Sequence, residues 1–136
     1  MVYFGQLPPS LQLTSMHFSW CGVQLQPGKG SQGVLGGAAG LAALKHFGLQ
    51  GCGLLDGSAD EALSTALSQL PAGLEHLGMD CTQVEGGLPT AGLQRLQQLT
   101  YLSLKGFGLQ GPDAATPVLQ PLKDLTRLVD LRLDFW

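Results

Sequence analysis

The apolar positions along the chain follow a mixed spacing that fits neither a single helix nor a single strand. In the stretch LTYLSLKGFGL, apolar side chains stand at Leu99, Leu102, Leu104, Phe107 and Leu109. A helix would return its apolar residues every three or four positions, and a strand would alternate them in twos. Leu102 and Leu104 therefore predict one short strand with both side chains on one face, and the wider gaps predict a bend on either side.

The same spacing recurs along nearly the whole chain. Copies begin at Leu13, Leu44, Leu74, Leu99 and Leu128, which gives a repeat of about 25 to 31 residues. Units of this length cannot bury their own apolar face, so neighbouring units bury it for one another. The pattern predicts a single array of stacked units, with a short parallel strand in each and no interdomain linker.

The segments between these strands carry helix signals of unequal strength. The clearest helix is expected over 58–70, where a Ser58–Glu61 capping box opens an apolar face and Pro71 ends it. A weak helix is expected near 35–43 and a short one from Thr90 to about Leu99. Another is expected from 116 onward, where Pro121 keeps it short or 3₁₀-like.

The repeated unit resembles the leucine-rich repeat signature, L-x-x-L-x-L-x-x-N/C-x-L. The resemblance extends from about Leu13 to Trp136, and VEGGLPTAGLQRLQQL at 84–99 resembles the plant-type subclass of that family. LPAGLEHLGM at 70–79 is superficially similar to a bacterial subclass, whose units are much shorter. The chain departs from the signature at its Asn/Cys position, which holds Cys21, Cys52, Thr82, Phe107 and Trp136.

This resemblance implies a fold, a function and an origin. The fold is an α/β leucine-rich-repeat solenoid: a right-handed array of about five repeats, with a curved parallel sheet on the concave side and short helices or 3₁₀ turns on the convex side. The repeats start near 13, 44, 74, 99 and 128 of one domain over 1–136, and 1–12 serves as an improvised N-terminal cap. The family further implies a plant or green-algal origin and a non-catalytic scaffold that binds a protein partner through its concave face.

Three columns of residues face away from the apolar layer of the predicted sheet. The first column is Ser15, His46, His76, Tyr101 and Asp130; the second is His17, Gly48, Gly78, Ser103 and Arg132; the third is Ser19, Gln50, Asp80, Lys105 and Asp134. We expect the partner contacts to be Ser15, His17, Trp20, His46, His76, Asp80, Tyr101, Lys105, Asp130 and Arg132. The paired glycines leave shallow notches that suit an inserted side chain of a partner.

His46 and His76 would lie on adjacent strands, with Glu75 and Asp80 nearby. Such a group could bind a metal or respond to pH. A tetrahedral site needs four well-placed ligands, however, and two histidines with carboxylates whose placement the spacing does not fix are a poor set. The sequence favours a polar binding face over a metal site, and we expect no metal and no cofactor.

In each repeat, the segment that leads from the strand back to the start of the next repeat is its return. The last repeat stops before its return, so its apolar layer would lie open at Leu128, Leu131, Leu133 and Trp136. An exposed apolar layer is typical of an interaction surface. Three explanations compete: the chain is a fragment of a longer repeat protein, it pairs end to end with itself, or another subunit covers it. The alternative function is therefore a small accessory subunit that docks into a larger assembly through this layer.

Composition narrows the class of protein. The net charge is −3, only 12% of the residues are charged, and 44% are hydrophobic, which argues against disorder and against a basic nucleic-acid binder. We expect no membrane span and no secretory signal, and an intracellular location in the cytoplasm or an organelle. Enzymatic activity is not expected, because an open sheet lacks an enclosed cleft and QPGKGS at 26–31 lacks the full phosphate-loop motif.

The three cysteines form no even disulfide set, which favours a reducing compartment. Cys21 and Cys52 hold the same position in adjacent repeats, so a disulfide between them is geometrically conceivable, although buried reduced thiols are expected. Cys81 is offset by one position from this column, and we expect it near the sheet surface as the more reactive thiol.

Overall fold

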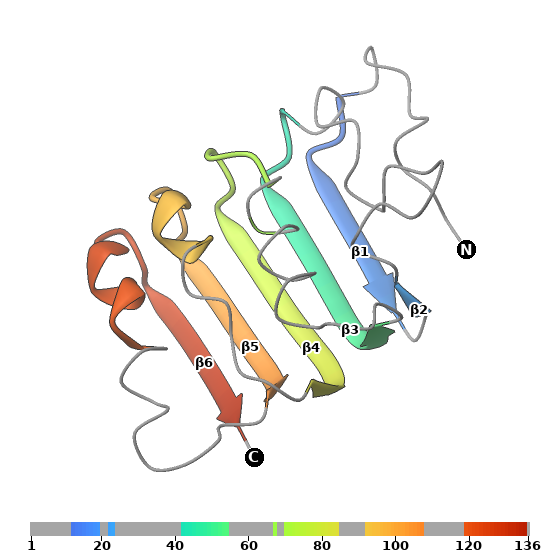
Figure 1. The fold of residues 1–136 in the computed structure, drawn as a ribbon. Coiled ribbons are helices and arrows are strands. Elements are labelled where there is room, and N and C mark those ends of the chain that lie inside the picture. Colours follow the sequence, from blue (N-terminus) through green and yellow to red (C-terminus); the bar gives the residue numbers. More distant parts are fainter. Residues whose placement is uncertain are drawn as a thin grey trace.

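A parallel β-sheet dominates the computed structural model, which describes residues 12–19, 22–23, 42–54, 67, 70–84, 92–107 and 119–135. The strands are β1 (Ser15–Ser19), β2 (Gly22–Val23), β3 (His46–Leu54), β4 (His76–Val84), β5 (Tyr101–Phe107) and β6 (Asp130–Phe135). They lie in the order β1-β3-β4-β5-β6, so each strand neighbours the next long strand of the sequence, and β2 pairs with β3 (Figure 1). This sheet, with few helical turns, is compatible with the α/β class.

A recurring backbone hydrogen-bond pattern joins each strand to the next. The carbonyl just before a strand accepts bonds from two successive N–H groups of the following repeat: that of Thr100 accepts from Val129 at 2.8 Å and from Asp130 at 3.0 Å. The carbonyls of Thr14, Lys45 and Glu75 do the same in the other repeats. The strands β1, β3, β4, β5 and β6 therefore begin at the same height in the sheet.

A tight turn precedes these shared carbonyls. The N–H of Leu99 donates to the carbonyl of Leu96 at 3.2 Å, and that of Leu128 donates to the carbonyl of Leu125 at 3.2 Å. The corresponding bond in the preceding repeat runs from Leu74 to Pro71. Strand entry is thus the most regular part of the repeat.

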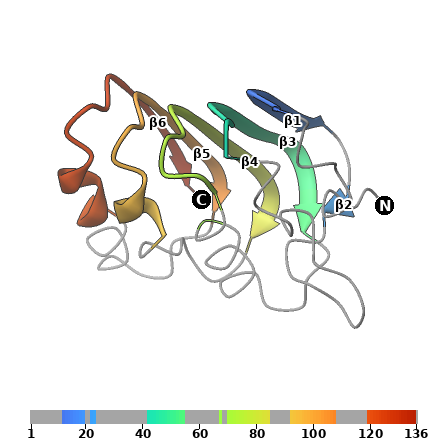
Figure 2. The ribbon, with the colours of Figure 1, turned by 90° about the horizontal axis from the view of Figure 1, so that it is seen from above.

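Leucine side chains fill the core on one face of the sheet. Leu77, Leu102 and Leu104 have no exposed surface, and Leu99 packs beneath them from the turn. The other fully enclosed or nearly enclosed side chains are Met16, Leu44, Phe47, Leu49, Leu67, Leu70, Leu74, Met79, Leu93, Leu96 and Leu125. The predicted inward positions from 44 to 104 are confirmed wherever their side chains are described. Figure 2 shows the helical turns η3 (Leu93–Arg95) and η4 (Pro121–Asp124) on this core side of the sheet.

The pairing register confirms that the residues of each predicted outward column are paired on adjacent strands. His76, for example, is paired with His46 on one side and with Tyr101 on the other. The same holds from Ser15 across to Asp130, from His17 to Arg132, and from Ser19 to Asp134.

Beyond these columns the predicted register is wrong. Cys52 pairs with Cys81 rather than with Thr82, and Phe107 pairs with Phe135 rather than with Trp136. Gly51 stands at the register shift between β3 and β4, and Gly106 at the shifts on both sides of β5, with φ of 61° and 81°. A left-handed glycine that adds one residue to a strand is a bulge, and counting positions along the sequence cannot include it. Cys81 is therefore opposite Cys52, not offset from it.

The helical returns are shorter than predicted where they can be compared. The helix expected from Thr90 to about Leu99 is a three-residue 3₁₀ turn, η3, because the backbone leaves helical geometry at Leu96 (φ −88°, ψ 61°). The expected 3₁₀ character at Pro121 is confirmed by η4. The helix expected near 35–43 lies almost wholly outside the described residues, as does that over 58–70, of which only Leu67 and Leu70 are described.

Neighbouring returns touch closely at one glycine. A Cβ built on Gly92 would lie 2.5 Å from the Cβ of Leu67, which is 1% exposed. Beside this contact, the Arg95 guanidinium donates to the carbonyls of Leu67, at 2.9 Å, and Leu70. Gly92 therefore allows the two returns to pack at this distance.

We predict that Gly92→Ala lowers the free energy of unfolding by roughly 1–3 kcal/mol, the usual cost of overpacking. Alanine would suit the helical φ of Gly92 and would itself contribute up to about 1 kcal/mol, but the Leu67 Cβ is fixed to the backbone and cannot move aside. The control is Gly73→Ala, whose new Cβ would meet only the Lys45 Nζ at 3.6 Å. Urea denaturation of both variants measures the effect, and equal stabilities would contradict the close packing.

Candidate functional site

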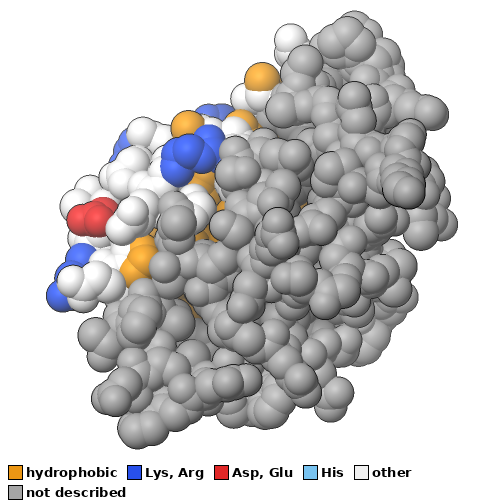
Figure 3. Space-filling view, viewed as in Figure 1, with side chains coloured by type: hydrophobic (Ala, Val, Ile, Leu, Met, Phe, Trp, Pro, Cys, Tyr) orange, Lys and Arg blue, Asp and Glu red, His pale blue; other side chains and the backbone are white. Residues whose placement is uncertain are grey.

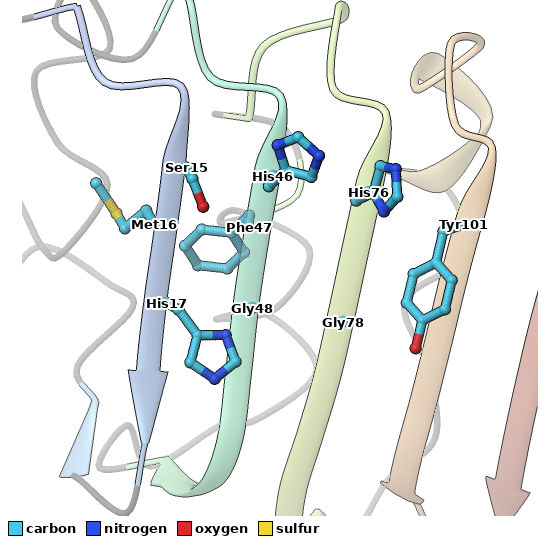
Figure 4. A pocket seen from close by; sticks show the side chains of 9 residues that line it. All are labelled: Ser15, Met16, His17, His46, Phe47, Gly48, His76, Gly78 and Tyr101. Atoms are coloured by element: carbon cyan, nitrogen blue, oxygen red, sulfur yellow. The ribbon is translucent and has the colours of Figure 1, made fainter.

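The sheet face opposite the leucine core carries the three outward columns, and we refer to it as the ladder face. Figure 4 looks onto it, with side chains from β1, β3, β4 and β5. Because strand residues alternate between faces, the residues of the second column stand between inward positions of their own strands, as Gly78 does between Leu77 and Met79. The core and the ladder face are therefore set by one and the same register.

Four planar groups form a row across the first two columns. The ring centroids of His46 and His76 are 4.4 Å apart, and those of His76 and Tyr101 are 5.6 Å apart with an interplanar angle of 20°. The Arg132 guanidinium lies over the Tyr101 ring, 5.5 Å from its centroid. We call His46, His76, Tyr101 and Arg132 the ring row. The strand spacing of about 4.8 Å brings rings at equal heights into the range of aromatic contact.

Asp130 holds the last member of the ring row in place. The Arg132 Nε donates to one carboxylate oxygen of Asp130 at 3.3 Å and the Nη2 to the other at 3.1 Å. This hydrogen bonding, followed by the negative charge of Asp130 and then by Tyr101, raises the pKa of the Arg132 guanidinium. Both side chains are well exposed, so the pair orients the guanidinium over Tyr101 rather than adding much stability.

A shallow hollow of about 220 Å³ lies beside the ring row. Its lining is Ser15, Met16, His17, His46, Phe47, Gly48, His76, Gly78 and Tyr101 (Figure 4). A Cβ on Gly48 would lie 2.3 Å from the Nδ1 of His17, so the imidazole of His17 covers that glycine. A Cβ on Gly78 would meet nothing within 4 Å. The hollow is therefore open over Gly78 and occupied over Gly48.

Ser103 was expected to face outward, and its burial corrects that expectation in part. It is in register with Gly78 on the ladder face, yet it is only 8% exposed. It stands between Tyr101 and Lys105 on its own strand and is paired with Arg132 on β6, and all three of these residues have longer side chains. In the part of the chain that the structure describes, its hydroxyl has no hydrogen-bond partner.

Asp80 and Lys105 are paired in register on β4 and β5, in the third column. Both are half-buried. Among the described residues the ion pairs are Lys45–Glu75, at 3.3 Å, and Arg132–Asp130. Asp80 and Lys105 thus place opposite charges on adjacent strands without forming a close ion pair.

The ladder face carries the histidines His17, His46 and His76. No group of three or more His, Cys, Asp or Glu side chains converges within the described ranges. His46 and His76 lie ring against ring, which suits stacking better than shared coordination.

The open layer expected at the C-terminal repeat has uneven exposure. Leu131 is 42% exposed, whereas Leu128 and Leu133 are half-buried. The sequence interpretation missed Val129, which is 87% exposed. The residues at the equivalent position of the other repeats are all polar: Thr14, Lys45, Glu75 and Thr100. A valine at a position that is otherwise polar indicates an exposed apolar side chain, and the sequence alone contains this information. Trp20 and Trp136 lie outside the residues whose side chains are described.

On the side of the sheet opposite the ladder face, the described side chains form no basic stripe. In Figure 3, which has the same view as Figure 1, lysine and arginine side chains stand separately along one margin. No helix in the described ranges is long and apolar enough to cross a membrane.

Comparison of the chain with protein-family models, curated proteins and solved structures gives no match. Inferences about function therefore rest on the repeat and on the geometry of the ladder face.

Proposed function

We propose that the chain is a non-catalytic scaffold of the leucine-rich-repeat type that binds a protein partner through the ladder face. On this proposal the sheet is part of a solenoid and the ladder face is its concave side. The recurrence of strand entry through shared carbonyls supports a solenoid, because each repeat meets its neighbour in the same way.

The observation that carries this proposal is the ring row beside the open hollow. Tyrosine and arginine are enriched among the residues that contribute most to protein interfaces, and here Tyr101 and Arg132 are held against one another by Asp130. Because the rings are already packed side by side, little side-chain entropy remains to be lost when a partner covers them. The ladder face is thus preorganised for binding.

The size of the hollow favours a partner's side chain over a free substrate. Pockets for small molecules usually enclose about 300–1,000 Å³, and the hollow is smaller, about 220 Å³, and open to one side. A protein partner would cover it and supply its missing wall.

We expect the double substitution Tyr101→Ala with His76→Ala to weaken protein binding at least about tenfold, as loss of a hot spot does. Both side chains lie on the ladder face and outside the leucine core, so the fold should persist. The probe is a set of peptides selected from a random displayed library on the unchanged chain. Their affinities are then measured by calorimetry.

The matched control is Gln120→Ala with Lys123→Ala, two exposed residues at η4 on the other side of the sheet. Circular dichroism checks that all variants remain folded. Peptide affinities that fall with the η4 pair but not with the Tyr101–His76 pair would contradict the proposal.

A second function, that of an accessory subunit docked through β6, is favoured by a separate observation. The two most C-terminal of the exposed large hydrophobic residues among the described ones, Val129 and Leu131, lie just before and on β6, whereas the third, Leu119, precedes η4. β6 is also at the edge of the described sheet, with β5 as its neighbour (Figure 1). Apolar side chains along a sheet edge are typical of an interface.

For this second function we predict that Val129→Asp with Leu131→Asp shifts the chain toward the monomer, because charge opposes the burial of this edge. Light scattering coupled to size exclusion, over a concentration series, measures the mass. A chain that is already a soluble monomer without substitution, at every concentration, would contradict docking through β6.

A further inference from the structure

We propose that the hollow receives one aromatic side chain of the partner, a tryptophan or tyrosine, which stands over Gly78 between His17 and Tyr101. We call this space the Gly78 slot. The inference rests on the proposed function, because it names the group that a protein partner would insert into the ladder face.

The width of the Gly78 slot matches one planar group. His17 covers Gly48 on one side, and Gly48 and Gly78 are paired on adjacent strands, which lie about 4.8 Å apart. Tyr101 bounds the other side from β5 (Figure 4). Stacked or tilted rings prefer centroid separations of about 4.5–7 Å, so an inserted ring would touch both walls.

The existing ring row shows that this spacing supports ring contacts. His46, His76 and Tyr101 stand on three successive strands at 4.4 and 5.6 Å. The second column begins with the imidazole of His17 and continues with an empty place over Gly78. Ser103 follows on β5, where Tyr101 is its neighbour in the first column. An aromatic side chain over Gly78 would repeat in this column the arrangement that the first column already has.

Charge distinguishes an aromatic ring from an arginine, the other planar side chain that fits. The Tyr101 ring already carries the Arg132 cation, and a second guanidinium would place two like charges against one ring. Asp80 could attract a cation, but Lys105 stands in register beside it. The described lining of the hollow contains no carboxylate. The charged groups on the neighbouring positions, Asp80 beside Lys105 and Asp130 paired with Arg132, balance one another.

Ser103 supplies an independent reason to expect a polar group on the inserted ring. Its hydroxyl is buried, since the residue is 8% exposed, and it lies in register beside Gly78 without a partner among the described residues. Buried polar groups are nearly always hydrogen-bonded. The indole N–H of tryptophan or the O–H of tyrosine can donate to the Ser103 Oγ, whereas phenylalanine cannot.

The test uses amino-acid amides as probes for the slot. We expect N-acetyl-tryptophanamide to bind with a dissociation constant on the order of 1–10 mM, as suits so small a ligand. In ¹H–¹⁵N spectra it should shift the signals of Gly78, Gly48 and His17 most. N-acetyl-leucinamide and N-acetyl-argininamide are the comparison probes, and binding of either as tight as that of the tryptophan amide would overturn the proposal.

Two substitutions change the slot in opposite ways. Gly78→Val fills it, and because nothing lies within 4 Å of the new Cβ and valine favours strands, the variant should keep its melting temperature and lose tryptophanamide binding. His17→Ala removes one wall and should weaken binding about threefold or more, the loss of one aromatic contact. Ser19→Ala, exposed on the same strand and face, is the matched control and should bind unchanged.

The outcomes separate this inference from the function on which it rests. If library peptides bind through Tyr101 and His76 but Gly78→Val leaves tryptophanamide binding unchanged, the aromatic occupant is wrong and the binding face stands. If tryptophanamide shifts Gly78 and is lost in Gly78→Val while the Tyr101–His76 variant keeps all peptide binding, the slot stands and the partner-binding function is wrong.

Discussion

One carbonyl oxygen that accepts two N–H groups from the next repeat is the interaction on which the sheet depends. It recurs at Thr14, Lys45, Glu75 and Thr100, immediately before a strand each time. By setting where the next strand starts, it sets which residues face the core. A slip of one residue would turn every strand leucine outward and every column residue inward. The burial of Leu77, Leu102 and Leu104 on the core face therefore stabilises the same register.

The arrangement of the ladder face follows directly from this register. Residues at equal heights on adjacent strands lie about 4.8 Å apart, and His46, His76 and Tyr101 therefore come into ring contact. In the second column, Gly48 and Gly78 are paired on adjacent strands, and their lack of side chains leaves space on the ladder face. His17 occupies one of these places, and the other, over Gly78, stays open. The open place over Gly78 thus arises where the repeat is regular in backbone and irregular in side-chain size.

Much of this arrangement could be predicted from the sequence, because strand positions alternate and the leucine spacing marks the inward side. The three outward columns and the 3₁₀ character at Pro121 follow from such local rules. Three features did not follow. The bulges at Gly51 and Gly106 depend on backbone conformation rather than on the apolar pattern. The orientation of His17 over Gly48 and the burial of Ser103 depend on side-chain packing between strands, which no single segment encodes.

The most direct test of the register is a nuclear Overhauser measurement on the free chain in solution. The account predicts cross-peaks between the ring protons of His46 and His76, and between those of His76 and Tyr101, together with contacts between Leu77 and Leu102 on the core side. Cross-peaks that pair Tyr101 with Leu77, or His76 with Leu102, would mean a register shifted by one residue. Such a result would contradict the ladder face and every inference drawn from it.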